Sequence, residues 1–246
     1  MIKGIYAAAS GMLAESLRTD ATANNLANVN TAGYKKDAAV NKAFAEMLIS
    51  RINDGPVQPV GNVGTGAEVD EIVAIHTQGM MRATDNPLDL AIEGEGYFAV
   101  ETPAGVRYTR NGTFSRNGLG ELTTAEGYPV LAEGGGRLLV EGGSLFVGED
   151  GVVSADGLEI GRLQLTEFSD RRLLVKEGDS LFRNDGAAQR QPGGLVRQGM
   201  LEMSNVNAVA EMVNLINGYR AYEVNSKAVQ AHDQLLDKAV NEIGRV

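Results

Sequence analysis

Apolar residues follow a heptad pattern along the C-terminal segment 207–246. Steps of three and four residues connect ten positions, eight of them apolar, and no Pro interrupts the run. Asn207 precedes the pattern and is a good N-cap residue. The pattern predicts a long amphipathic helix that needs a partner helix, because one helix cannot bury its own apolar stripe. This seam consists of Met212, Leu215, Tyr219, Tyr222, Ser226, Val229, Asp233, Leu236, Val240 and Ile243.

A weaker version of the same spacing runs through the N-terminal segment. Its positions, half of them small or polar, are Ile2, Ile5, Ala9, Met12, Ser16, Thr19, Ala23 and Leu26. From Ile5 to Leu26 there is no Pro and a single Gly, which favours a helix. We expect this helix to end in the Asn-rich stretch before Gly33, where Gly offers a left-handed C-terminal cap. Because Gly and Ser dilute the apolar run, we interpret it as a mature helix rather than a signal peptide.

The middle of the chain is rich in turns. All six Pro and most of the 31 Gly lie between Gly55 and Gly199. Short, partly alternating runs predict strands at residues 69–77, 88–92, 97–102, 106–109, 138–140, 162–168 and 173–176. Hairpin turns are predicted at the dipeptides Asn111-Gly112, Asn117-Gly118, Asp150-Gly151 and Asp156-Gly157. This pattern is typical of an antiparallel β domain of many short strands.

These patterns predict an α+β fold with four segments. Residues 1–34 form the N-terminal helix of a coiled-coil-like stem, and residues 204–246 form its C-terminal helix. Residues 67–203 form a central antiparallel all-β domain. Residues 35–66 form a variable connector, in which Val40, Phe44, Met47 and Leu48 fit one face of a possible second, short helix.

Composition and charge narrow the possible partners. A formal net charge of −10 disfavours nucleic acid and anionic membrane surfaces, which both attract Lys and Arg. No apolar run approaches the roughly 18 residues of a membrane span. Aromatic residues make up 5 % of the chain, so a pocket lined by aromatic side chains is not favoured. The absence of Cys excludes disulfides and thiol chemistry.

The search for catalytic or metal sites finds no convincing cluster. His76 and His232 have no suitable partners nearby in sequence, and a zinc site without Cys would lack ligands. The Gly-rich stretches lack the Lys-Ser/Thr of a phosphate loop, and the stretch 150–157 lacks the carboxylates of a calcium loop. Glu93, Glu95 and Glu101 are better explained as solvated turn residues than as an acid pair. We therefore predict no enzyme activity, no metal and no cofactor.

Asn residues gather at the end of the N-terminal helix, at positions 24, 25, 28 and 30. Asn disfavours helix interiors because its side chain competes for backbone groups. The cluster is therefore either a fraying helix end or a set of amides that fixes the register of a helix contact.

Four stretches together resemble the flagellar axial family, the rod and hook subunits of bacterial flagella. The first, Ala23–Lys35 (ANNLANVNTAGYK), resembles its N-terminal signature, with Ala32 where the family often has Pro. Two others, NPLDLAIEGEGYF from Asn86 and YTRNGTFS from Tyr108, resemble its central β domain. GMLEMSNVN from Gly199, followed by Glu211-Met-Val and Arg220-Ala-Tyr-Glu223, resembles its C-terminal signature. The matches occur in the right order over nearly the whole chain.

This resemblance implies a subunit of the basal-body rod in the cell envelope. Such subunits are exported uncleaved through the flagellar type III apparatus and polymerise into a hollow helical shaft that transmits torque to the hook. Their terminal helices line the inner tube, and their β domains form an outer layer. The partners implied are other copies of the chain, neighbouring rod and hook subunits, and the export apparatus, with no nucleic acid, membrane insertion or small-molecule substrate.

The resemblance also points to an assembly interface. From the N-terminal motif it contains Asn24, Asn25, Leu26, Asn28, Asn30, Gly33 and Tyr34. From the C-terminal seam it contains Met212, Leu215, Tyr219, Tyr222, Val229, Leu236, Val240 and Ile243. The short chain and its single β domain exclude a hook subunit or a filament protein. The variable segment from Lys35 to Gly64 favours a proximal-rod over a distal-rod subunit.

Two other classes of function would use the same sequence differently. A secreted β-domain adhesin or binding module would not need paired terminal heptads, so that deletion of both ends would leave its activity intact. An enzyme would require acidic side chains of the β domain to line one pocket.

Overall fold

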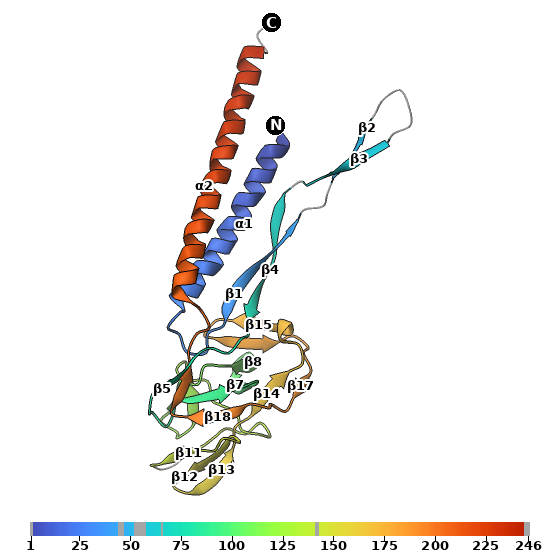
Figure 1. The fold of residues 1–246 in the computed structure, drawn as a ribbon. Coiled ribbons are helices and arrows are strands. Elements are labelled where there is room, and N and C mark those ends of the chain that lie inside the picture. The colour runs from blue at the N-terminus through green and yellow to red at the C-terminus, as the bar shows by residue number, and fades with distance from the viewer. Residues whose placement is uncertain (1, 44–46, 52–57, 65, 141–142, 244–246) are drawn as a thin grey trace. The chain divides into compact units, whose positions relative to one another are not determined.

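The computed structural model describes residues 2–43, 47–51, 58–64, 66–140 and 143–243. They form two compact units. The first unit contains Met1–Leu26, Asp37–Val73 and Asn207–Val246, and the second contains Ala27–Lys36 and Ala74–Val206. The fold is α+β, as the sequence predicts, with one helix near each end of the chain and many short strands between them (Figure 1). None of the helices described is long and apolar enough to cross a bilayer.

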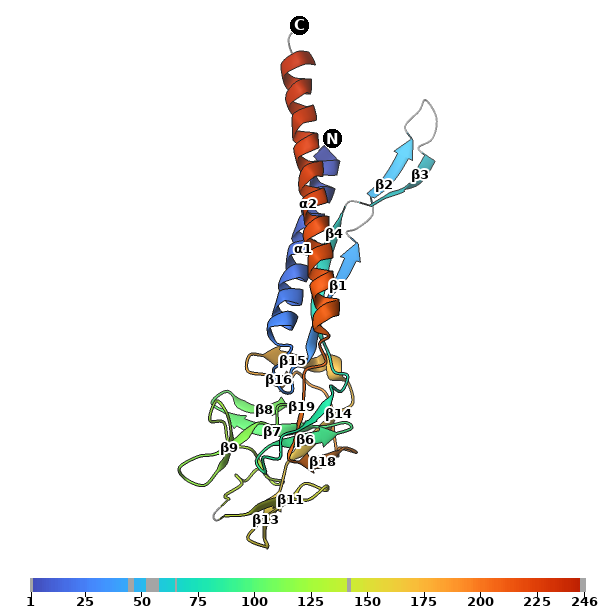
Figure 2. The same cartoon turned by 60° about the vertical axis from the view of Figure 1, so that its left-hand side comes forward.

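Two long helices dominate the first unit. Helix α1 spans Ile2–Ala27, and helix α2 spans Ala208–Lys238 and continues into a π-helical turn, Ala239–Ile243. The side chain of Asn207 accepts a hydrogen bond from the backbone N–H of Ala210 at 3.1 Å, which confirms the predicted N-cap. Both views show α1 and α2 side by side and antiparallel (Figures 1 and 2).

The remaining part of the first unit consists of paired strands. Strand β1 (Lys36–Ala43) pairs with β4 (Ala67–Ile75), and β2 (Met47–Arg51) pairs antiparallel with β3 (Gln58–Val63). The prediction of a short helix within residues 35–53 is therefore wrong for the residues described there; Phe44 lies outside them. A short apolar run fits either period, and pairing with a distant strand decides in favour of β structure.

The second unit is built around a six-stranded antiparallel sheet with the strand order β15-β16-β8-β7-β14-β17. Its strands are β7 (Tyr97–Thr102), β8 (Gly105–Thr109), β14 (Leu165–Phe168), β15 (Leu174–Glu177), β16 (Leu181–Asn184) and β17 (Gln189–Arg190). Smaller antiparallel sheets are formed by β5 (Met81–Ala83) with β19 (Met200–Glu202), β6 (Leu90–Glu93) with β18 (Leu195–Gln198), β9 (Phe114–Arg116) with β10 (Leu122–Thr124), and β11 (Leu145–Val147), β12 (Val152–Ala155) and β13 (Leu158–Arg162) together. A short 3₁₀ helix spans Arg171–Leu173.

Strand β7 separates two hydrophobic cores. Side chains alternate between the faces of a strand, so that Phe98 and Val100 lie in one core while Tyr97 and Ala99 lie in the other. All four side chains are buried. The second unit therefore covers both faces of its central strand with its own residues.

Turn chemistry explains two of the hairpins. Asp156 and Gly157, with φ values of 51° and 84°, connect β12 to β13, and Asp150-Gly151 lies between β11 and β12. A dipeptide with two positive φ angles matches the right-handed twist of the flanking strands, which explains the turn at Asp156-Gly157; at Asp150-Gly151 only Gly151 has a positive φ. The predicted strand 138–140 is only an isolated bridge between Glu121 and Leu139.

Candidate assembly interface

Glycines allow helices α1 and α2 of the first unit to approach closely. Three pairs of positions meet: Gly4 with His232, Gly11 with Asn225, and Gly218 with Thr19. A Cβ atom on Gly4 would lie 2.6 Å from Nε2 of His232, which leaves no room for a larger residue without a shift. Residue numbers rise along α1 as they fall along α2, so that the contact is antiparallel throughout.

The α2 face that contacts α1 is not the most apolar one. Gly218, Asn225 and His232 are seven residues apart and lie on one stripe, and Glu211, seven residues earlier, is buried. The sequence thus predicts the heptad period correctly. The predicted seam, however, is rotated by one residue from this stripe.

The predicted seam residues of α2 differ in exposure. Leu215, Val229 and Leu236 are half-buried. Four others are exposed: Met212, Tyr219, Tyr222 and Val240. The side chain of Ile243 lies outside the part of the structure that is described. A single chain therefore covers its predicted seam only in part.

Further apolar side chains lie on the outward sides of both helices. On α2, successive residues turn by about 100°, which places Val213, Ile216 and Val224 roughly opposite the Gly218 stripe. All three are exposed, and so are Tyr6 and Leu17 of α1. A helix that is apolar on several sides is normally buried on several sides.

Asn25 of the predicted N-terminal motif holds α1 against β1. Its side-chain Nδ2 donates to the carbonyl of Asp37, and its Oδ1 accepts from the N–H of the same residue, both at 2.8 Å. Only 1 % of Asn25 is exposed. This amide pairs with the backbone of a strand, so its contact is not the helix–helix contact predicted for the Asn cluster.

The later residues of the motif lie in the second unit. Gly33 adopts φ +68°, and a Cβ there would lie 2.1 Å from the backbone N of Asn111, so that only Gly fits. Helix α1 ends before this point, at Ala27, so Gly33 serves a turn rather than the predicted helix cap. Tyr34 is buried, and the ammonium of Lys176 lies 3.7 Å from its ring centroid.

The other motif residues lie nearer the surface. Oδ1 of Asn28 accepts a hydrogen bond from Oγ1 of Thr31 at 3.2 Å. Leu26 and Asn28 are half-buried, whereas Asn24 and Asn30 are exposed. Of the seven residues, three are therefore buried inside the fold of a single chain, namely Asn25, Gly33 and Tyr34.

A buried ionic cluster in the second unit was not identified from the sequence. Oε1 of Glu202 lies 2.5 Å from Nζ of Lys35, and its Oε2 lies 3.1 Å from a guanidinium nitrogen of Arg110. The N–H of Gly79 also donates to this carboxylate, at 2.8 Å. The side chains of Glu202, Lys35 and Arg110 are all almost completely buried. One carboxylate thus connects the segment that enters the second unit with the segment that leaves it.

The sequence holds a signal for this cluster. Lys35 and Glu202 are charged residues inside the two terminal signatures; Lys35 follows Tyr34, and Glu202 lies between Leu201 and Met203. A buried charge needs an opposite charge and further hydrogen bonds, so two such residues could have been paired. Burial lowers the pKa of Lys35, and the Glu202 carboxylate opposes this effect.

His76 packs beside the cluster in an aromatic environment. Its Nδ1 lies 2.8 Å from the hydroxyl of Tyr97, and its ring contacts Phe182 at a centroid distance of 5.1 Å. Burial, together with nearby cations such as Lys35, lowers the pKa of His76 to about 4. Burial also raises the pKa of Tyr97 to about 12, so that at neutral pH both groups are uncharged. This supports a structural role for His76.

The three carboxylates considered as an acid pair each form an ion pair with a different Arg. Glu93 pairs with Arg197, Glu95 with Arg171, and Glu101 with Arg137. These side chains are about half exposed. They do not converge on one point, which agrees with their interpretation as surface residues.

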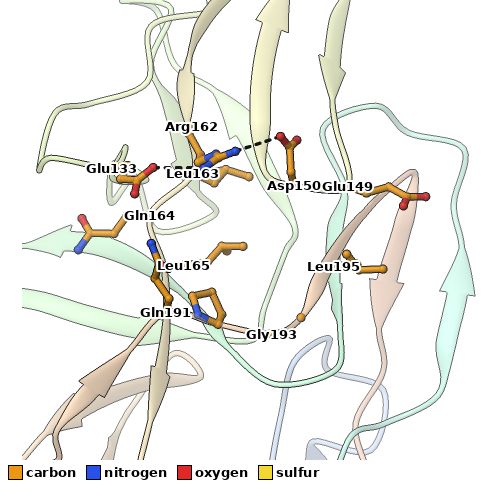
Figure 3. Close-up of a pocket in the computed structure, with 12 residues that line it drawn as sticks. Glu133, Glu149, Asp150, Arg162, Leu163, Gln164, Leu165, Gln191, Gly193 and Leu195 are labelled. Atoms are coloured by element: carbon orange, nitrogen blue, oxygen red, sulfur yellow. Dashed lines mark hydrogen bonds and ion pairs between the residues drawn. The ribbon is translucent and has the colours of Figure 1, made fainter.

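A pocket of about 330 Å³ lies at the surface of the second unit, and Figure 3 shows its lining. Arg162 lies 3.0 Å from the carboxylate of Asp150 and 3.8 Å from that of Glu133, while Leu163 and Leu165 supply apolar surface. Hydrogen bonds from the Val152 N–H and Arg162 keep the pKa of Asp150 below its usual range. Asp150 is therefore not poised to exchange a proton near neutral pH. Within the described residues, no group of three His, Asp or Glu side chains is arranged to hold a metal ion.

Comparisons with known proteins find matches at both ends of the chain and in its middle. Three family models match the chain: "Flagella basal body rod protein" over residues 5–35, "Flagellar hook protein FlgE/F/G D1 domain" over residues 91–155, and "Flagellar basal body rod FlgEFG protein C-terminal" over residues 197–242.

Full-length relatives extend this match. The chain is 34 % identical to the flagellar hook-basal body complex protein FlhO of Bacillus subtilis, with all of both proteins aligned. It is 36 % identical to the flagellar basal-body rod protein FlgG of Borreliella burgdorferi, with 98 % of each aligned. It is also 36 % identical to the flagellar basal-body rod protein FlgF of Caulobacter vibrioides, with all of both aligned. The chain belongs to the family of flagellar basal-body rod proteins.

Proposed function

We propose that this chain is a structural subunit of the flagellar basal-body rod that polymerises through its terminal helices. It is not an enzyme. The observation that carries this proposal is the match of both terminal helices and the β unit, in order, to rod proteins over their full length. In this function, α1 and α2 form a coiled-coil-like stem, and repeated stems build a shaft that transmits torque to the hook.

Unsatisfied apolar surface supports assembly through the helices. Met212, Tyr219 and Tyr222 of the predicted seam are exposed in one chain. Burying an apolar side chain of this size against a neighbour contributes about 1.5–3 kcal/mol. Several such contacts in every copy offset the loss of freedom on association. The helices therefore gain further burial from other subunits.

The motif residues divide between two tasks in this proposal. Buried members such as Asn25 and Gly33 set the backbone path of one chain. Exposed members, Asn24 and Asn30, contact another subunit together with the exposed seam residues in this proposal. The interface thus combines contact residues with residues that position them.

The chain works in the flagellar basal body beside other copies of itself and neighbouring rod or hook subunits. Delivery through the flagellar type III export apparatus follows from the family resemblance of both terminal signatures. A proximal rather than a distal place in the rod stays a prediction based on the variable segment from Lys35 to Gly64.

Deletion of the chain from its own bacterium tests this function. Hook–basal bodies purified from the parent cells should contain the chain, and deletion should stop assembly at the rod. A complete, rotating basal body without the chain would overturn the proposal. The last component present in stalled particles distinguishes the proximal from the distal position.

A single substitution tests the part played by the helices. Leu215→Asp places a charge in the half-buried part of the seam, and we expect a folded β unit but no incorporation into basal bodies. Leu215→Met, which keeps an apolar side chain of similar volume at the same position, is the matched control and should assemble normally. Equal incorporation of both variants would exclude the seam as an assembly interface.

A further inference from the structure

We propose that the surface pocket of the second unit binds an aliphatic diamine, a small molecule with an ammonium group at each end of an alkyl chain. The pocket has a volume of about 330 Å³, which is large enough for such a molecule. Two ion-pair triads at the sides of the pocket, and the apolar surface between them, point to this ligand. Such a ligand site is independent of the proposed rod function.

The first triad consists of one guanidinium between two carboxylates. The guanidinium of Arg162 lies 3.0 Å from the carboxylate of Asp150 and 3.8 Å from that of Glu133. Among the described residues, no further cation pairs with either carboxylate. One positive charge between two negative charges leaves this triad with a net charge of −1.

The second triad repeats this arrangement around Arg197. Its guanidinium lies 2.7 Å from the carboxylate of Glu93 and 2.5 Å from that of Glu149. Glu149 lines the pocket, whereas Glu93 belongs to strand β6, the partner of β18. Two carboxylates again share one guanidinium, so the two triads together carry a net charge of −2.

The surface between the triads is apolar. Leu163, Leu165 and Leu195 line the pocket. In Figure 3 the side chains of Leu163 and Leu165 lie between Glu133 on one side and Glu149 on the other. Leu195 is 42 % exposed, so that its apolar surface is accessible to a ligand.

This combination selects a ligand with two separated cations. A single metal ion needs several carboxylates that converge on it, and no such group exists among the described residues. A simple alkylammonium ion would neutralise only one triad. A diamine places one ammonium at each triad and lays its methylene chain on the leucines, in the way that a lysine stem covers apolar surface. The charge of the pocket and its apolar surface therefore both favour a diamine.

Titration of the purified full chain with 1,5-diaminopentane tests this site. The backbone amide signals of Gly193 and Leu195 in the pocket should shift and reach saturation in nuclear magnetic resonance spectra. Pentylamine has one ammonium on the same carbon chain and should bind about fivefold more weakly, because it pairs with one triad only. The uncharged 1,5-pentanediol should not bind. Equal affinities of the diamine and the monoamine would overturn the proposal.

Substitutions in the triads locate the binding site. Glu133→Gln and Glu149→Gln each make one triad neutral and should each weaken diamine binding about fivefold. The matched control uses a third triad, in which Arg137 pairs with Glu101 and Glu121 but which does not line the pocket. Glu101→Gln should leave diamine binding unchanged. An equal loss of affinity in this control would overturn the pocket as the site.

Two further comparisons test the apolar contact and the source of the amine. Leu195→Ala should weaken diamine binding although all charges remain, and unchanged affinity would overturn the contact with the alkyl chain. Nα-acetyl-lysine amide represents a lysine side chain of a partner protein, and it should bind as weakly as pentylamine. Binding as tight as that of the diamine would assign the pocket to a protein partner instead. The melting temperatures of these surface variants should stay close to that of the parent chain.

Discussion

The two units of this protein differ in how far one chain satisfies its own packing. In the second unit, strand β7 is buried on both faces, and the largest side chains, such as Tyr97 and Phe98, are inaccessible to solvent. In the first unit, α1 and α2 leave large apolar residues such as Tyr6 and Val224 exposed. The comparison teaches that core formation and assembly are assigned to different parts of the sequence.

The largest expected effect breaks the core of the second unit. Phe98 is fully buried and packs edge-to-face against Phe114 at a centroid distance of 5.2 Å. Phe98→Ala should lower the free energy of unfolding by about 4 kcal/mol, because it removes apolar contacts and leaves a cavity. Chemical denaturation followed by near-ultraviolet circular dichroism measures this loss. Val106→Ala, at an exposed position of the neighbouring strand, is the control; an equally large loss there would contradict the comparison.

A somewhat smaller effect is expected at the buried ionic cluster. Glu202→Gln keeps the shape of the side chain but leaves Lys35 and Arg110 without a countercharge, at a cost of about 3 kcal/mol. Thermal unfolding of the purified full chain tests this. Glu101→Gln removes one partner of an exposed ion pair with Arg137 and should change stability little. Similar melting temperatures for both variants would argue against a structural role for the cluster.

Acid should destabilise the second unit through His76. Its pKa is about 4 in the folded chain and 6.5 in a solvated reference state, so that unfolding takes up a proton between these values. The stability contributed by neutral His76 is present above pH 6.5 and is lost progressively as the pH falls from 6.5 to 4, with about 2 kcal/mol lost by pH 5. Denaturation curves at pH 8 and pH 5 measure this difference. His76→Asn should flatten the pH dependence, and an unchanged slope would refute the assignment.

The smallest effect on folding is expected on the outward helix surface. Val224→Ala should change the free energy of unfolding of the isolated chain by less than about 0.5 kcal/mol, because the side chain is mostly exposed. The same substitution should reduce incorporation into basal bodies. Measuring both quantities on one variant separates the stability of the fold from assembly. A large loss of stability without an assembly defect would contradict the assignment of Val224 to assembly rather than to folding.

Local sequence signals predicted the elements of the fold well. The heptad spacing and the N-cap Asn207 identified α2, and Asp156-Gly157 identified a hairpin turn. These features depend on a few neighbouring residues, so they can be recognised without knowledge of the rest of the chain. The strand 97–102 was predicted with its observed bounds for the same reason.

Features set by distant contacts could not be predicted. Residues 36–43 form a strand because they pair with β4, and their local spacing fits a helix equally well. The face of α2 that meets α1 is decided by where glycines permit close approach, as at Gly218, and not by apolar content. Which charged residues would be buried together also depended on contacts that only the fold reveals.

The ion pair between Lys35 and Glu202 also sets a condition on the order of folding. Its partners are 167 residues apart, so that the second unit cannot close until almost the whole polypeptide is available. A shorter, still growing piece would expose Lys35 and Arg110 without a countercharge and would lack two of the strands that end near Glu202. The second unit is therefore completed only after Glu202 has joined Lys35.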